Sequence, residues 1–169
     1  MDVRVIRSDR RTASVEIARD LTVTVRVPRR FSDERISEFV ERNSAWIARH
    51  LQAQRERNAK LRFPVDTAPE LLYAEAEKTL PPLLEKYIAL TGLKPKAVKV
   101  NSAKKRLGSC SPDGTIHFSY TLMLYPPEAV EYVVLHELAH LKERNHQRGF
   151  YALIERYMPD WRARRALLK

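Results

Sequence analysis

The sequence predicts an α+β protein in two parts, a small strand-and-helix part followed by a larger, mostly helical domain. Short segments near the N-terminus alternate apolar and polar residues, which is typical of half-buried strands. Longer segments from residue 32 onward repeat apolar residues at helical spacing. A proline-containing stretch over residues 58–69 separates the two parts. We therefore expect residues 1–66 to form the first part and residues 67–169 the main domain.

The first part begins with three strands at residues 3–7, 14–18 and 21–27, which we expect to pair as an antiparallel hairpin or meander. Ser32 is a candidate N-cap for a helix that continues to about residue 57. Together these elements predict a sheet that is covered by one long helix.

The second part begins with a helix over residues 69–90, which Pro81 and Pro82 should divide or kink and which Gly92 should end. A strand at 97–101 and a hairpin follow, because Ser111-Pro112-Asp113-Gly114 is a turn sequence between residues 105–109 and 115–120. Three further helices are expected at residues 127–143, 147–157 and 160–168.

The net charge of +10 raises the question of a nucleic-acid partner. Residues 1–66 carry 15 basic and 10 acidic side chains, and residues 67–169 carry 16 and 11, so each part has a charge of +5. Because no basic tail stands out, we interpret the charge as a solvated arginine-rich surface and leave nucleic acid as an alternative partner.

Several features favour a cytoplasmic protein. No secretory signal and no membrane-length apolar run are visible, so we expect no membrane partner. The single Cys110 excludes an internal disulfide, which fits a reducing compartment. Nothing in the sequence indicates an oligomeric state.

The most informative stretch is VLHELAHLKERNH, residues 134–146. His136 and His140 are four residues apart, so a helix places both imidazoles on one face, one turn apart. Two such nitrogens can bind one zinc ion at about 2.0–2.1 Å. Glu137 lies at the flank of that face, where it can act as a base without occupying a ligand position.

His146 is the candidate third ligand. On a continuous helix it would lie about 240° around from His140 and ~9 Å further along. The helix must therefore end between Leu141 and His146, and Asn145 is the expected point because asparagine tolerates the left-handed conformation. If His146 is instead a surface residue, Glu155 from the following helix would complete a His₂Glu site.

Residues 106–127 (RLGSCSPDGTIHFSYTLMLYPP) and 132–168 resemble the YgjP-like metallopeptidases, which are zincins related to the SprT and Wss-type proteases. The resemblance is strong over about residues 80–169. It implies a zincin-like metallopeptidase domain, zinc bound by His136, His140 and His146, and Glu137 as the catalytic base. Two positions depart from related motifs: Leu107 replaces a frequent tryptophan, and Glu143 replaces the glycine of the metzincin motif HExxHxxGxxH.

Other residues have weaker indications. The strand at residues 115–119 is either a sheet edge that pairs with an extended substrate or a core strand through Ile116 and Phe118. Cys110 is expected to pack, and neither His117 nor His50 is expected to bind metal. Candidate oxyanion stabilisers are Tyr120, Tyr151, Tyr157 and Arg148.

We therefore expect a zinc-dependent hydrolase of peptide bonds, acting on a peptide or protein substrate with Glu137 as the general base. One alternative is a protease associated with nucleic acid, as in the SprT and Wss relatives, whose cleavage should respond to DNA. Another is a non-enzymatic basic binding module whose zinc is structural, so that metal removal unfolds it.

Overall fold

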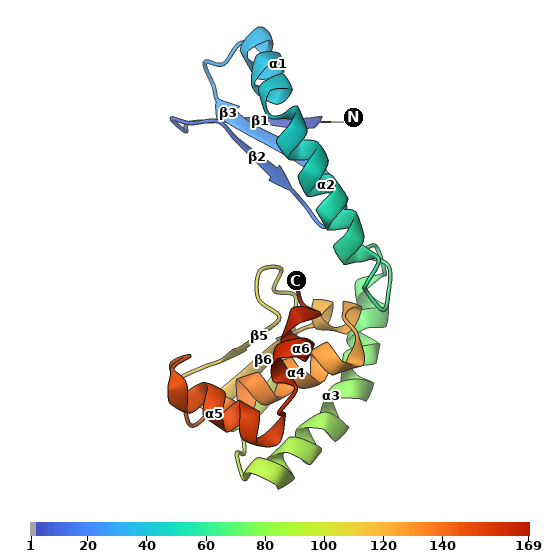
Figure 1. Cartoon of the computed structure of the whole chain (residues 1–169), viewed down its shortest axis with the longest axis vertical. Helices are drawn as coiled ribbons and strands as arrows, with labels where there is room; N and C mark the ends of the chain where they lie inside the picture. The colour runs from blue at the N-terminus through green and yellow to red at the C-terminus, as the bar shows by residue number, and fades with distance from the viewer. Residues whose placement is uncertain (1–2) are drawn as a thin grey trace. The chain divides into compact units, whose positions relative to one another are not determined.

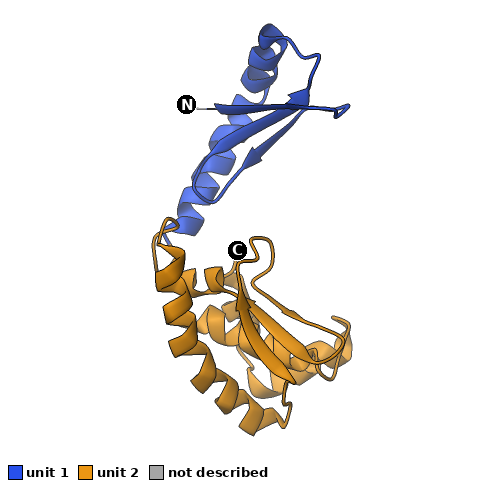
Figure 2. Cartoon of the chain, turned by 180° about the vertical axis from the view of Figure 1, so that it is seen from behind, with its two compact units in different colours: residues 1–59 blue, residues 60–169 orange. Residues whose placement is uncertain are grey.

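The computed structural model describes residues 3–169. Contacts between Cα atoms divide the chain into two compact units, Met1–Ala59 and Lys60–Lys169 (Figure 2). Each unit combines a three-stranded sheet with helices, which confirms the α+β class. No helix within residues 3–169 is both long and apolar enough to cross a bilayer.

The sheet of the first unit contains β1 (Val3–Ser8), β2 (Ser14–Ile17) and β3 (Val23–Pro28) in the order β1-β3-β2. Strands β2 and β3 pair antiparallel, but β1 runs parallel to β3, so an all-antiparallel meander does not form. The reason is burial: β3 carries Val23, Val25 and Val27, all at most 1% exposed. In the central position, this most apolar strand has backbone hydrogen bonds to a neighbouring strand on both sides.

Two helices, α1 (Asp33–Arg42) and α2 (Ser44–Asn58), replace the single helix that was expected. Ser32 is the N-cap of α1, as predicted, and its hydroxyl accepts a hydrogen bond from the Arg35 amide. The break falls at Asn43, whose side-chain amide donates to the Phe39 carbonyl at 2.7 Å. An asparagine that occupies a helical carbonyl in this way competes with continuation of the helix.

The second unit contains a long curved helix, a small sheet and three shorter helices (Figure 1). In order these are α3 (Pro69–Thr91), β4 (Ala97–Asn101), β5 (Gly108–Cys110), β6 (Thr115–Ser119), the 3-10 helix η1 (Tyr120–Leu124), α4 (Pro127–Ala139), α5 (Arg148–Tyr157) and α6 (Trp161–Ala166). Helix α3 continues through Pro81 and Pro82 as one helix and ends at Gly92, whose φ of 71° is left-handed. The 3-10 helix was not predicted.

Strands β5 and β6 form the predicted hairpin, and the strand order is β4-β6-β5. The segment 115–119 is therefore the central strand, so the expectation that it could be a substrate-binding edge is wrong. Its residues explain the placement, because Ile116 and Phe118 are fully buried in the main core. The strand next to the histidine-bearing helix is β5, which has only one sheet partner.

Helix α4 lies at the centre of this unit and is buried along most of its length. Its one half-buried acidic residue, Glu131, accepts hydrogen bonds from Lys86 of α3 and from Arg164 of α6. These ion pairs connect three helices, and α4 therefore has little freedom to shift relative to its neighbours.

Candidate metal centre

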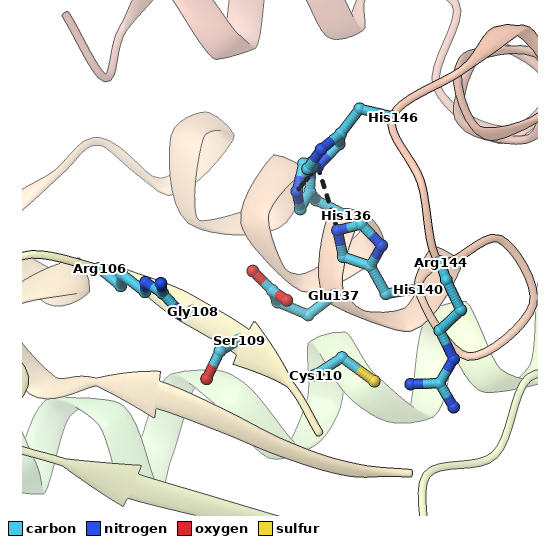
Figure 3. A pocket seen from close by; sticks show the side chains of 9 residues that line it. All are labelled: Arg106, Gly108, Ser109, Cys110, His136, Glu137, His140, Arg144 and His146. Atoms are coloured by element: carbon cyan, nitrogen blue, oxygen red, sulfur yellow. Dashed lines mark hydrogen bonds between the residues drawn. The ribbon is translucent and has the colours of Figure 1, made fainter. Parts of the chain in front are cut away.

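Three histidines converge at the C-terminal end of α4 (Figure 3). The Nε2 atom of His146 lies 3.1 Å from Nε2 of His136 and 3.1 Å from Nε2 of His140. Nitrogen ligands about 2.0–2.1 Å from a tetrahedral zinc ion are separated by about 3.3 Å, so these atoms are spaced like ligands of one ion. The structure thus brings together all three residues that the sequence nominated as ligands.

The remaining ring nitrogens of two histidines have partners that orient the rings. Nδ1 of His140 donates to the Glu143 carbonyl at 3.0 Å, which leaves its Nε2 lone pair free. Nδ1 of His136 lies 3.3 Å from the Tyr132 hydroxyl. Such outer partners fix the tautomer of a metal-binding imidazole.

Phe150 of α5 packs against all three histidine rings. Its ring centroid lies 4.6–4.9 Å from the centroid of each histidine ring, and the side chain is fully buried. Its position shows that α5 supplies an apolar contact to each imidazole, which limits how the three rings can tilt.

The turn that returns His146 to the cluster differs from the prediction. Helix α4 already ends at Ala139, and the backbone continues in 3-10 hydrogen bonds to Lys142. Leu21 is the one non-glycine residue with positive φ within residues 3–169, so Asn145 is not left-handed and the proposed mechanism is wrong. The change of direction begins earlier, at His140.

Two interactions hold the loop that follows. The Arg144 guanidinium donates to the carbonyls of Ser111 and Pro112 at 3.0 and 2.9 Å, which ties the loop to the β5–β6 turn. The Glu143 carboxylate packs over Gly149 in the first turn of α5, where a negative charge is favourable. The non-glycine residue at position 143 is therefore accommodated by a different turn, not by strain.

Glu137 points from α4 toward β5 and lies between the histidines and that strand (Figure 3). The residue is 5% exposed, and its side chain packs against Gly108. A Cβ at position 108 would lie 2.6 Å from Oε1 of Glu137 and 2.7 Å from its Cγ, which no real contact permits. Glycine at this position is thus a steric requirement for the observed placement of the carboxylate.

Burial changes the acid–base properties of these groups. It raises the pKa of Glu137 to about 7, although the positive charge of Arg106 opposes the rise. It lowers the pKa of His136 to about 3, with further contributions from His140 and His146, and it also lowers the pKa of His140. These two imidazoles are therefore neutral at pH 7, as metal ligation requires.

The histidines and Glu137 line one cavity of about 310 Å³. Arg106, Gly108 and Arg144 also line it, and the sequence did not single them out. The available signal was their position, because Gly108 begins the Gly-Ser-Cys strand and Arg106 lies two residues before it. None of the four side chains considered as oxyanion stabilisers lines this cavity.

The other candidates lie apart from the histidine cluster. Glu155 is exposed on α5 and forms a salt bridge with Arg162 at 2.7 Å. His117 lies on β6 opposite Ser109, and His50 lies on α2 in the first unit. Cys110 borders the cavity and packs against the core, and burial raises the pKa of its thiol.

The pKa of Glu137 predicts a pH-dependent stability in protein freed of metal. The folded-state pKa of about 7 exceeds the ordinary 4.5, so a contribution present below pH 4.5 is lost as the pH rises through 7. At about 1.4 kcal/mol per pH unit this loss is at most about 3 kcal/mol. Glu137→Gln should therefore raise the melting temperature by several degrees at pH 8 and change it little at pH 5. An equal effect at both pH values in a thermal scan would contradict this.

Comparison with known proteins bears on the identity of the fold. Comparison with curated proteins found no match. Among solved structures, the metallopeptidase zymogen of Pyrococcus abyssi abylysin matches with a TM-score of 0.48 and 24% sequence identity, over 53% of this chain and 90% of that chain. The family model described as YgjP-like, metallopeptidase domain, matches residues 11–69 and 64–169, and the chain therefore belongs to the YgjP-like metallopeptidase family.

Proposed function

We propose that the protein is a zinc-dependent peptidase in which His136, His140 and His146 bind the metal and Glu137 is the general base. The observation that supports this most is the single cavity that contains three converging Nε2 atoms and a buried carboxylate. Three protein ligands leave a fourth position open, as in catalytic zinc sites. Imidazole suits several transition metals, and we propose zinc because a three-ligand site with an open position is typical of catalytic zinc.

Bound zinc would supply a Lewis acid that acidifies water and polarises a carbonyl. The chain itself supplies the proton transfers. Glu137 accepts a proton from the attacking water and then delivers it to the leaving amine. A structural zinc site needs no such carboxylate, which weighs against the non-enzymatic alternative.

Strand β5 is suited to hold an extended substrate. The Leu107 carbonyl accepts a hydrogen bond from the Ser119 amide, and the Ser111 amide donates to the Thr115 carbonyl. The alternation of an antiparallel pair therefore turns the amides and carbonyls of Gly108 and Cys110 toward the free edge. Both residues also line the cavity. A peptide could add to this edge as a further strand and pass the histidine cluster with its carbonyl accessible.

Removal of the carboxylate of Glu137 tests its role as the base. Glu137→Gln should bind zinc with unchanged stoichiometry but should lower peptide turnover by about 10²- to 10⁴-fold, the usual contribution of general acid–base catalysis. Metal analysis and cleavage of a diverse peptide library, read by mass spectrometry, check both parts. Full activity in this variant would remove Glu137 from the mechanism.

Replacement of Gly108 tests whether turnover depends on the placement of Glu137. A methyl group in Gly108→Ala must displace Glu137, so turnover should fall about 10- to 100-fold while zinc content is kept. Shortening the acid in the double variant with Glu137→Asp should restore part of the activity. Gly92→Ala is the control, because its φ of +71° makes it destabilising by roughly 1 kcal/mol with nothing within 4 Å of the new methyl. Equal loss of turnover in both alanine variants would show that Gly108 acts only through stability.

A further inference from the structure

A second cavity, which we call the side cavity, opens beside Glu137. It has a volume of about 360 Å³ and shares His136, Glu137, Gly108 and Arg106 with the first cavity. Its walls come from β5 and the segment before it, from α4, and from α6 and the residues that follow it. A group in the side cavity would therefore lie next to the bond that the proposed base acts on.

The inner surface of the side cavity is apolar. Leu107, Tyr132, Val133 and Leu168 contribute to it. Tyr132 and Val133 are buried residues of α4, while Leu107 and Leu168 are half-buried and pack against the main core. The Tyr132 and Val133 side of the cavity is fixed by the packing of α4 in the core.

The mouth of the side cavity is basic. Lys105, Arg106, Arg165 and Lys169 line it, and all four are exposed. None of them forms a salt bridge with another residue of the part of the chain that the structure describes. Neighbouring arginines of α6 differ, because Arg162 pairs with Glu155 and Arg164 pairs with Glu131 and Asp160.

No acidic side chain balances these cations around the site. Three adjoining cavities contain Arg106, and among their lining residues Glu137 has the sole acidic side chain. Glu137 is buried and takes part in the proposed chemistry, so it is not available as a permanent counter-charge. A cleft of uniform sign attracts ligands of the opposite charge.

We propose that the side cavity selects peptides with a glutamate adjoining the scissile bond. The glutamate methylenes would contact Leu107 and Leu168, and its carboxylate would meet the guanidinium of Arg165 at the mouth. Guanidinium and carboxylate groups form strong, charge-assisted hydrogen bonds. The selection rests on the proposed peptidase function, but the recognition itself does not require catalysis.

The geometry favours a side chain over a nucleic-acid backbone. A polyanion is bound by cations that follow its phosphates along a strip. Four cations instead line one apolar-walled cavity beside Glu137, and Lys104 and Arg144 line the adjoining cavities. An oligonucleotide is nevertheless a useful competitor, because it would also be held by Arg165 if the cations served a polyanion.

The test compares peptides that differ only in Glu, Gln or Lys at each position of a library. Zinc-loaded protein should cut next to Glu at least about tenfold faster than next to Gln, as one charge-assisted contact allows. Arg165→Glu should abolish this preference and accept Lys. Arg156→Glu is the matched control, since Arg156 is exposed on α5 and lines none of the three cavities. An equal loss of preference in both variants would overturn the proposal.

A measurement of peptide binding tests the recognition of glutamate independently of the peptidase function. Fluorescent peptides that contain Glu or Gln are titrated into zinc-loaded wild type and into the Arg165→Glu variant at low salt. Tighter binding of the Glu peptide that depends on Arg165 supports the recognition, even if nothing is cleaved and the peptidase function fails. Equal affinity for both peptides would overturn it. So would Arg165-dependent binding of a single-stranded oligonucleotide that displaces the Glu peptide.

Discussion

The convergence of three imidazole nitrogens, with Nε2 of His146 3.1 Å from Nε2 of each of the other two, is the constraint on which the rest of the second unit depends. Three rings that converge in this way must be held there by their surroundings. Helix α4 fixes two of them through its buried position, and the fully buried Phe150 limits the tilt of all three. The third requires the chain to leave the helix at Ala139 and return within seven residues.

The same arrangement explains why β5 lies where it does. Antiparallel pairing with β6 places Gly108 directly against Glu137, and a larger residue there would move the carboxylate. Arg144 connects the turn of this hairpin to the loop that carries His146. The hairpin and the metal-binding loop are therefore held together. A change in either is expected to move both the histidine ligands and the carboxylate of Glu137.

Local patterns predicted the parts of this site that depend on local geometry. The i, i+4 spacing of His136 and His140 needs only a helix, and Gly92 ended α3 as its conformation suggested. Features set by tertiary packing were missed. The central positions of β3 and β6 follow from relative burial, which no single strand reveals. The break at Asn43 depends on a side chain that competes with the backbone of its own helix.

The return of His146 shows the limit most clearly. The sequence required a helix break, but the residue chosen for it, Asn145, is not the one that turns the chain. The loop is instead held by the long-range contact of Arg144 with Ser111 and Pro112, more than 30 residues away. Arg106 was overlooked for a similar reason, since its relation to Glu137 exists only once β5 packs beside α4.

The most direct test of the account is the zinc affinity of two alanine variants, measured by metal analysis and chelator competition. His146→Ala should weaken binding by at least about 100-fold, because the loss of a ligand costs more than the loss of an outer partner. Glu155→Ala, which removes an exposed salt bridge, should bind like wild type. Unchanged zinc content in His146→Ala together with an empty site in Glu155→Ala would contradict the three-histidine centre.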